Sequence, residues 1–275
     1  MGLRINNNLA SLNAQRNLAN TTDQLSRSLA KLSSGLRITR ASDDAAGLAI
    51  SERFRADVRG LQQAERNAND GISLLQVAEG ALNETSSVLI RLRELGVQSA
   101  NGTLGSSERA ALDSEFQDLT TEISRIANST KFNGIKLLDG TNASVTFQIG
   151  IDNSSNDQIT VTGVDATATG IGVVGATAVD TLTNAQNSLS VIDSAIDKVT
   201  SLRATFGTAQ NRLESTIRSI RVSVENTSAA ESRIRDVDVA SETAILTKNQ
   251  VLQQAGIAVL AQANVSTQQA LRLLQ

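Results

Sequence analysis

The stretch Ala185–Val224 reads AQNSLSVIDSAIDKVTSLRATFGTAQNRLESTIRSIRVSV, and an apolar residue returns in it every seven positions. The first row consists of Ala185, Ile192, Val199, Phe206, Leu213 and Ile220. The second row, four positions later, contains Leu189, Ile196, Ile217 and Val224. A strict seven-residue repeat corresponds to 3.5 residues per turn and predicts a helix that coils around a partner helix. At 1.5 Å per residue the predicted helix is roughly 55–65 Å long.

A matching repeat lies earlier in the chain and supplies the partner. Its row consists of Phe54, Leu61, Ala68, Leu75, Leu82 and Leu89, and Val58 and Ile72 add the positions four residues later. A turn-bearing segment separates the two repeats, so the chain is expected to run out and come back. The chain contains no proline, which fits long helices because an interior proline removes a backbone hydrogen bond. The predicted fold is mainly α, a long antiparallel coiled-coil helical bundle.

Both ends of the chain carry the same kind of repeat. The N-terminal row is Leu18, Leu25 and Leu32; the C-terminal rows are Val237, Ala244, Val251, Ala258 and Val265, and Ile245, Leu252 and Val259. Helices of this length are marginal alone in water, so they need a surface to pack on. They could pack on each other within one molecule, or they could order fully only when neighbouring subunits bury their apolar faces. The width of the C-terminal apolar face favours the second possibility.

The middle of the chain has a different pattern. Apolar and polar residues alternate in Val145–Ile151 and in Ile159–Thr162, with the turn-rich sequence DNSSND at Asp152–Asp157 between them, which predicts one β-hairpin. The Gly/Ala/Thr-rich segment Gly163–Asp180 is expected to be a loop. Turn signals on both sides of Ile135–Leu138 predict a short strand there. Helix breaks are predicted near Ser34–Ser42, Asn101–Gly105 and Thr227–Arg235.

Composition excludes several functions. The 275 residues include no Cys and no His, which removes thiolate nucleophiles, Cys-type zinc sites and the commonest general base. Aromatic residues make up only 2% of the chain, so the core is expected to be Leu, Ile, Val and Ala rather than a ring-lined ligand pocket. The net charge of −3 argues against a general nucleic-acid binder. The segment Arg4–Asn8 is polar where a cleaved signal peptide would be apolar, and the longest apolar run, Gly256–Ala261, is too short to span a bilayer. We expect no enzyme, no cofactor, no metal and no membrane contact.

Three short motifs have structural interpretations that we favour. Gly170, Gly172 and Gly175 match GxGxxG, but no strand leads directly into them and the next predicted helix begins only at about Thr183, so a flexible loop is expected rather than a dinucleotide site. Asp43-Asp44 and Asp236–Asp238 are interpreted as helix N-caps, with metal ligation and inter-subunit pairing as the alternatives. The first 40 residues carry six Lys and Arg against Asp23 alone. A subunit contact or a solvated face is favoured over membrane binding, because the apolar face lacks aromatic residues.

Several long motifs, in order, closely resemble bacterial flagellin. They are SLNAQRNL at 11–18, LSSGLRI at 32–38, ASDDAAGLAI at 41–50, NANDGIS at 67–73, RELGVQSANG at 93–102, KFNG at 131–134, SRIRDVDVA at 232–240 and QQAGIAVLAQAN at 253–264. The resemblance covers about residues 1–140 and 185–275. It implies a structural subunit that polymerises into the extracellular flagellar filament for swimming.

The resemblance also implies a domain organisation. Residues 1–42 and 231–275 would form the terminal helical core domain at the centre of the filament. Residues 43–140 and 181–230 would form the helical rod domain, and residues 141–180 the β-hairpin and loop as a minimal variable region. The residues expected to bury one another in the polymer core are Leu18, Leu25, Leu32, Val251, Leu252, Val259, Leu271 and Leu274.

Partners follow from the resemblance as well. Flagellins leave the cell through the flagellar export channel without a cleaved signal peptide, a cytoplasmic chaperone holds their C-terminal segment, and hook-associated and cap proteins contact the filament. The animal innate receptor for flagellin recognises the rod domain, and Arg91, Leu95 and Glu115 match its contacts. Two alternatives remain: a hook–filament junction protein, which would not elongate, and a chemoreceptor-like signalling hairpin. The β-patterned middle and the missing membrane anchor argue against the second alternative.

Overall fold

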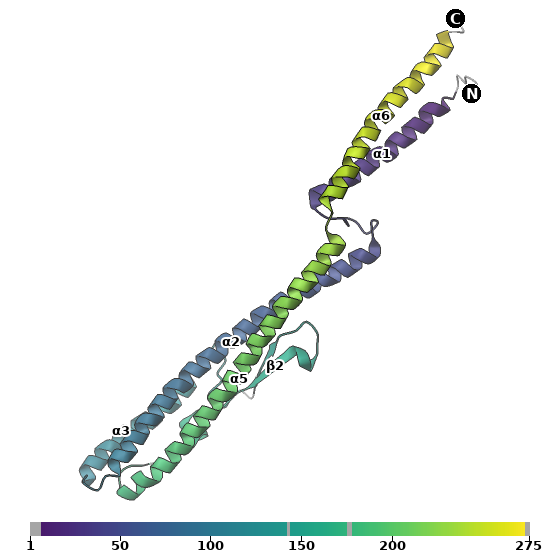
Figure 1. Cartoon of the computed structure of the whole chain (residues 1–275). Coiled ribbons are helices and arrows are strands. Elements are labelled where there is room, and N and C mark those ends of the chain that lie inside the picture. Colours follow the sequence, from purple (N-terminus) through teal and green to yellow (C-terminus); the bar gives the residue numbers. More distant parts are fainter. Residues whose placement is uncertain (1–6, 142–143, 175–177, 273–275) are drawn as a thin grey trace. The chain divides into compact units, whose positions relative to one another are not determined.

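The computed structural model describes residues 7–141, 144–174 and 178–272, with only the helical backbone described for residues 266–272. Six α-helices in these residues are α1 (Leu9–Ser34), α2 (Ala45–Ser99), α3 (Ser106–Ser129), α4 (Ala168–Ile171), α5 (Leu182–Arg235) and α6 (Val239–Arg272). The strands β1 (Ser144–Gln148) and β2 (Gln158–Thr162) pair in one antiparallel sheet, and a 3-10 turn η1 (Ser155–Asp157) precedes β2 (Figure 1). The predicted fold class is confirmed.

The chain divides into two compact units. The terminal unit consists of Met1–Asp57 and Asn226–Gln275, and the central unit is Val58–Glu225. The boundary therefore falls inside α2 and α5, whereas the sequence-based division into core and rod domains placed it at residues 42/43 and 230/231. The assignment of these segments to a filament core and a rod remains a prediction.

In the central unit, α2 and α5 run antiparallel. Three ion pairs connect them: Glu65–Arg221 at 2.7 Å, Glu79–Arg203 at 3.8 Å and Arg93–Asp193 at 2.7 Å. In these pairs the residue numbers rise along α2 as they fall along α5, so the two helices are antiparallel. Between the ion pairs lie the two predicted heptad rows. Leu75, Leu82 and Leu89 of α2 are 0–1% exposed, and all six residues of the α5 row are buried. The central coiled-coil prediction is confirmed in its packing.

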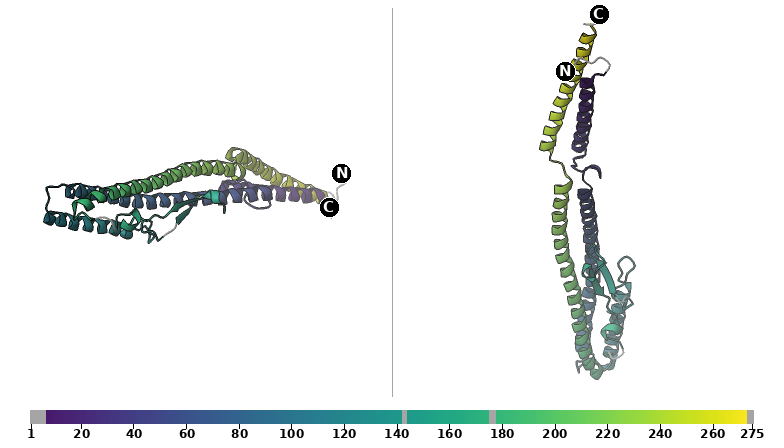
Figure 2. Two further views of the ribbon diagram at one scale, coloured as in Figure 1. Left: turned by 90° about the horizontal axis from the view of Figure 1, so that it is seen from below. Right: turned by 90° about the vertical axis from the view of Figure 1, so that its right-hand side faces the viewer.

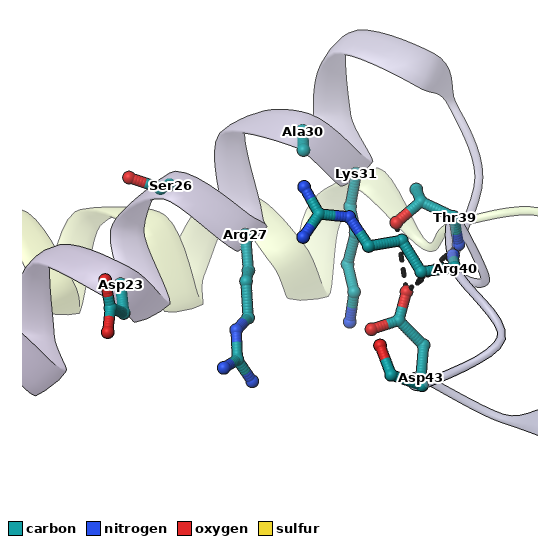
Figure 3. A pocket seen from close by; sticks show the side chains of 9 residues that line it. Asp23, Ser26, Arg27, Ala30, Lys31, Thr39, Arg40 and Asp43 are labelled. Atoms are coloured by element: carbon teal, nitrogen blue, oxygen red, sulfur yellow. Dashed lines mark hydrogen bonds between the residues drawn. The ribbon is translucent and has the colours of Figure 1, made fainter.

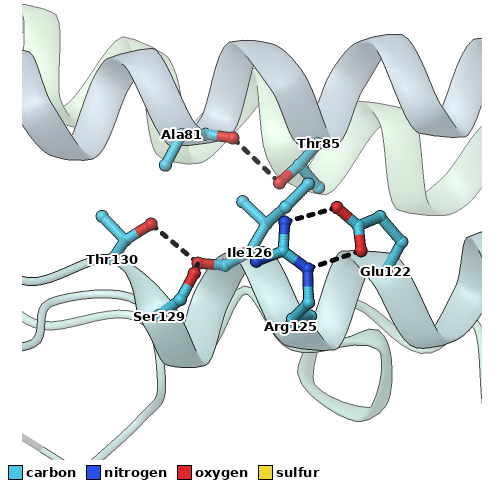
Figure 4. A network of polar contacts seen from close by, with 7 residues as sticks. All are labelled: Ala81, Thr85, Glu122, Arg125, Ile126, Ser129 and Thr130. Carbon is cyan, nitrogen blue, oxygen red and sulfur yellow. Dashed lines mark hydrogen bonds and ion pairs between the residues drawn. The ribbon is translucent and has the colours of Figure 1, made fainter.

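Helix α3 returns along α2 after a short connection and completes the central core. Its buried side chains are Phe116, Thr120, Ile123 and Ala127. The Arg109 side chain donates hydrogen bonds to the carbonyls of Ser99 and Asn101 at 2.9 and 2.8 Å, which satisfies carbonyls at the end of α2. The other end of α3 is closed by its own side chains, since the hydroxyls of Ser129 and Thr130 both donate to the Ile126 carbonyl. Figure 4 shows this end, with the Arg125–Glu122 ion pair one turn earlier.

The β-hairpin packs on α2 where α2 has glycines. A methyl group on Gly71 would lie 3.1–3.2 Å from the Phe147 ring, and one on Gly60 would lie 2.7 Å from Ile151 Cγ2. The Asn67 amide adds a hydrogen bond of 3.0 Å to the Gln148 carbonyl. A helix surface without Cβ atoms lets the hairpin approach closely. The predicted hairpin is confirmed, although β1 ends at Gln148 instead of Ile151.

Three predictions about secondary structure are wrong. Ile135–Leu138 forms no strand, because its pairing is limited to the Phe132–Ile135 bridge and to backbone hydrogen bonds from Val164 and Ala166. Within the segment expected to be a loop, Ala168–Ile171 forms the short helix α4, whose Ala168 and Ile171 are buried in the central core. The break expected at Thr227–Arg235 lies later, at Asp236–Asp238, because Asn226–Arg235 contains no Gly or Pro and Asp238 starts the next helix. The breaks after Ser34 and around Asn101–Gly105 are confirmed.

Candidate assembly surface

In the terminal unit, α1 and α6 lie side by side, as both views in Figure 2 show. Two backbone hydrogen bonds join the ends of this pair: Arg37 N–H donates to the Arg235 carbonyl at 2.7 Å, and Val237 N–H donates to the Gly35 carbonyl at 3.0 Å. Gly35 ends α1 with a φ of +72°, a left-handed conformation that glycine adopts without strain.

Two aspartates start the helices that leave this junction. Asp44 Oδ1 accepts a hydrogen bond from Gly47 N–H at 2.8 Å, and Asp238 Oδ1 accepts from Ala240 and Ser241 N–H. These N-caps confirm half of the predicted set. Asp43 instead accepts from Thr39 and Arg40 in the preceding loop, and Asp236 accepts from Ser232 Oγ. The pKa of Asp43 is lowered, first by the Thr39 hydroxyl and then by the backbone N–H groups of Arg40 and Thr39.

The contact between α1 and α6 is made largely by small and polar residues. On α6, one row of residues that face α1 recurs every seven positions and consists of Glu242, Asn249, Gly256 and Ala263. Leu246, Gln253 and Leu260 lie between them on the same face. On α1 the residues that face α6 are Ser11, Ala14, Leu18, Thr21, Leu25, Ser28 and Leu32. Hydrogen bonds close the open end, where the Asn8 amide donates to the Ala263 carbonyl at 2.9 Å and Ser11 Oγ donates to Asn264 at 3.1 Å. We call this contact the polar seam.

Seven large apolar residues of α6 lie outside the polar seam. Their exposed fractions are 59% for Val239, 44% for Ile245, 59% for Val251, 46% for Leu252, 54% for Ile257, 58% for Val259 and 42% for Val265. At 100° per residue, the row Ile245, Leu252 and Val259 flanks the seam, and Val251 lies on the far side of the helix. A helix that is apolar on most of its circumference is one that a protein normally buries. On α1, Leu9, Leu12 and Leu29 are also at least half exposed.

The two units differ in whether they contain a core of their own. The connected core of buried apolar residues runs from Ala68 to Ile217 and lies entirely in the central unit. Among the described residues, Ala14 and Ile38 are the only apolar residues of the terminal unit that are less than 9% exposed. A helix pair without a core needs further surfaces to bury its apolar side chains. The exposed apolar side chains of α1 and α6 are therefore the candidate assembly surface.

The predicted polymer-core residues fall into three groups. Leu18, Leu25 and Leu32 line the polar seam and are half-buried against α6. Val251, Leu252 and Val259 are exposed on the candidate assembly surface. The side chain of Leu271 and the whole of Leu274 lie outside the described residues. No contact with a second copy tests these assignments, so they stay predictions.

Of the predicted receptor contacts, two lie together on the surface and one does not. Arg91 on α2 forms an ion pair with Glu115 on α3 at 2.8 Å, and both side chains are nearly half exposed. Arg91 also donates a hydrogen bond to the Glu94 carboxylate. The pKa of Arg91 is raised, first by the hydrogen bond to Glu115 and then by that to Glu94. Leu95 is 0% exposed in this structure, and a receptor contact at this position stays a prediction. Its position four residues before Ser99, on the same helix face as that buried serine, could have indicated burial.

The described part of the chain contains no phosphate-binding loop, no metal-binding cluster and no membrane-spanning helix. The backbone N–H groups of Gly170 and Gly172 are used within the α4 turn, by Thr167 Oγ1 and by the Thr169 carbonyl, so they are not available to hold a phosphate; Gly175 lies outside the described residues. Across the same ranges, no cluster of three or more carboxylates is placed to hold a metal ion. None of the described helices combines the length and apolarity that crossing a membrane requires.

Comparison with known proteins agrees with this architecture. The bacterial flagellin N-terminal helical region matches residues 5–143, and the bacterial flagellin C-terminal helical region matches residues 189–274. The chain belongs to the bacterial flagellin family. Flagellins are structural proteins rather than enzymes.

Relatives match over nearly the whole chain. The flagellin of Halalkalibacterium halodurans is 49% identical over 271 residues, which are 98% of this chain and 99% of that protein. The flagellar filament 33 kDa core protein of Treponema phagedenis is 45% identical over 284 residues, again 98% and 99% of the two chains. The crystal structure of Bacillus cereus flagellin superposes with a TM-score of 0.51 at 33% identity, covering 56% of this chain and 88% of that one.

The sequence patterns of this flagellin did not reveal the polar seam. The apolar rows of α6 were expected to face a partner helix, yet in the structure they lie outside the contact with α1. One signal was present: Glu242, Asn249, Gly256 and Ala263 are spaced seven residues apart and interrupt the apolar surface. Such a row of small and polar residues identifies the face where another helix backbone approaches closely.

Proposed function

We propose that this chain is the repeating subunit of the flagellar filament and that it polymerises through its terminal unit. The observation that carries the proposal is that the terminal unit lacks a core while α6 leaves seven large apolar residues at least 42% exposed. The name of the Treponema relative, a flagellar filament core protein, supports the same function.

The physical mechanism is burial of apolar surface between copies. Each Å² of apolar surface removed from water contributes about 25 cal/mol, and the contributions of several exposed Val, Leu and Ile side chains add up. A subunit that contacts the next copy head to tail leaves its other surfaces free, so the contacts propagate into a helical polymer. The central unit has its own buried core and needs no neighbour to fold. It can therefore keep its structure on the outside of the polymer while the terminal unit is buried.

The proposal is tested by removing the end of α6. A chain lacking Val265–Gln275 should form no filaments in electron micrographs after salt-induced assembly. The central unit should keep its melting transition in circular dichroism, because it contains none of these residues. Normal filaments from the truncated chain would refute assembly through the terminal unit. Elongation on preformed filament seeds distinguishes a filament subunit, which extends them, from a hook–filament junction protein, which does not.

We propose further that the filament is extracellular and that a C-terminal-binding chaperone covers α6 before export through the flagellar channel. The exposed apolar side chains of α6 support this, because such surfaces associate prematurely when left uncovered. The expected partners also include the hook-associated and cap proteins. In cells that lack the chaperone, full-length chain should aggregate, whereas a chain without α6 should stay soluble. Equal solubility of the two chains would contradict a protective role.

Recognition by the animal innate receptor for flagellin is a second proposed role, supported by the exposed Arg91–Glu115 pair. These two side chains would contact the receptor, and buried Leu95 would hold α2 in place beneath them. The Arg91→Ala variant, applied as monomer to receptor-expressing reporter cells, should lose most of the response. The matched control is Arg125→Ala, which removes a more exposed arginine that pairs with Glu122 on α3. A response unchanged by Arg91→Ala would contradict the assignment.

A further inference from the structure

A second surface of the terminal unit is polar, and the candidate assembly surface does not include it. The loop Thr39–Asp43 folds back beside α1 and leaves an open hollow of about 410 Å³. Arg27 and Lys31 project into it from consecutive turns of α1, and Arg40 extends over it from the loop (Figure 3). By helical position, Arg27 lies on the face of α1 that is turned away from the polar seam, and Lys31 lies on the flank of α1 beside the seam. The hollow is therefore open to another molecule while α1 is packed against α6.

The side chains that line the hollow carry more positive than negative charge. In the part of the chain that the structure describes, the side chains of Arg27, Lys31 and Arg40 form no ion pair and no hydrogen bond. Two carboxylates also line the hollow. Asp43 is held by the loop, because its Oδ2 accepts hydrogen bonds from Thr39 N–H, Thr39 Oγ1 and Arg40 N–H at 2.9–3.1 Å. Asp23 lies at the other end, one turn before Arg27. Three cations and two anions leave a net charge of +1.

The lining indicates the kind of ligand. Ala30 is its only apolar side chain, and the remaining residues are charged or carry hydroxyl groups, so it offers nothing for an apolar or ring-shaped ligand. Arginine binds carboxylates through paired N–H donors, and such contacts strengthen when a second surface excludes water. An open hollow gains this exclusion only when a large partner closes it.

The distribution of charge along the chain identifies the partner. The terminal unit carries 12 Lys and Arg against 9 Asp and Glu, a net charge of +3, whereas the central unit carries 13 against 19, a net charge of −6. In a polymer of identical chains, the abundant acidic partners for a basic hollow are on central units. We propose that the hollow formed by Arg27, Lys31 and Arg40 receives an acidic side chain from the central unit of a second copy. This inference rests on the proposed function, since it requires assembly.

The sequence makes a direct test possible, because the chain has only five lysines and Lys31 is one of them. A carbodiimide joins a lysine amine to a carboxylate that it touches, through an amide bond. Filaments are assembled from a mixture of ¹⁵N-labelled and unlabelled chains, cross-linked, and analysed by mass spectrometry. We expect mixed-isotope peptides that link Lys31 to an Asp or Glu between Val58 and Glu225. Lys31 left uncoupled, coupled only within its own copy, or coupled to a terminal unit would overturn the proposal. Failure to form filaments at all would instead refute the proposed function.

A pair of variants tests the energetics. Arg27→Gln combined with Arg40→Gln should raise the critical concentration for assembly about 5- to 10-fold at low ionic strength, and added salt should reduce the difference. The matched control is Arg16→Gln combined with Arg53→Gln, two exposed arginines of the same unit outside the hollow, and its critical concentration should change less than twofold. Equal effects of the two double variants would overturn the proposal. A hollow occupied by a free anion would also overturn it: millimolar phosphate would then promote assembly of the parent chain and not of the Arg27/Arg40 variant.

Discussion

The Val259→Ala substitution tests assembly through α6 quantitatively. Val259 is 58% exposed, so assembly can bury about that fraction of its side chain. The substitution removes two methyl groups, each contributing about 0.8 kcal/mol when fully buried. The expected loss is about 0.9 kcal/mol per subunit added, which corresponds to an approximately fivefold higher critical concentration. Val251 is 59% exposed, and the double variant Val251→Ala/Val259→Ala should raise the critical concentration about 25-fold.

The assay is sedimentation of filaments grown from seeds over a range of protein concentrations. Gln254→Ala is the control, because Gln254 is exposed on the same helix and has no large apolar side chain to bury. Melting of the central unit serves as a second control and should be unchanged in every variant. If the double variant assembled at the same critical concentration as the parent chain, within twofold, α6 would not be buried by neighbours. The reasoning from its exposed side chains would then be wrong.

Three further predictions concern the central unit, each measured by chemical or thermal unfolding of the monomer. Phe206 is 1% exposed, so Phe206→Ala should cost about 3–5 kcal/mol of stability; a loss under 1 kcal/mol would contradict its place in the core. Gly80 has open space around its Cα, so Gly80→Ala should stabilise the central unit by about 0.8–1 kcal/mol. Gly96→Ala should destabilise it, because the added methyl group would lie 3.0 Å from Leu189 Cδ2. The opposite order of stability would refute the packing of α5 on α2. The pKa of Asp139 is lowered from 3.8, first by the Thr141 hydroxyl. Its carboxylate therefore stabilises the fold fully above pH 3.8 and loses this effect as the pH falls through the lowered pKa. Asp139→Asn should be less stable than the parent at pH 7, and a stability difference that does not shrink as the pH falls below 3.8 would refute the assignment.

The central coiled coil could be predicted from sequence because its apolar rows serve a partner in the same chain. The seven-residue spacing of Ile192, Val199 and Phe206 fixes which face is buried, and α2 supplies a matching face. The hairpin was predictable for a similar reason, since alternation and a turn-rich loop act over a short distance. Where a repeat is left exposed, as at Val251 and Val259, sequence alone does not say which helix covers it.

The errors have local causes. The composition of Ala168–Ile171, which is Ala, Thr, Gly and Ile, predicts a loop, yet burial of Ala168 and Ile171 in the central core orders it. The break predicted near Thr227 is absent because Asn226–Arg235 contains no Gly or Pro, and α5 continues to Arg235. Arg235 at the end of α5 bonds Glu52 on α2 at 2.7 Å. The hollow beside α1 was not predictable, because it depends on the path of the Thr39–Asp43 loop.

The polar seam has a consequence for delivery of the chain to its place of use. The α1–α6 contact combines small and polar residues with five half-buried leucines, so separating the two helices exposes less apolar surface than opening the fully buried central core would. Under the export proposed above, the two helices can separate for passage as an extended chain and pair again on arrival. Permanence then comes from the surrounding lattice of identical chains.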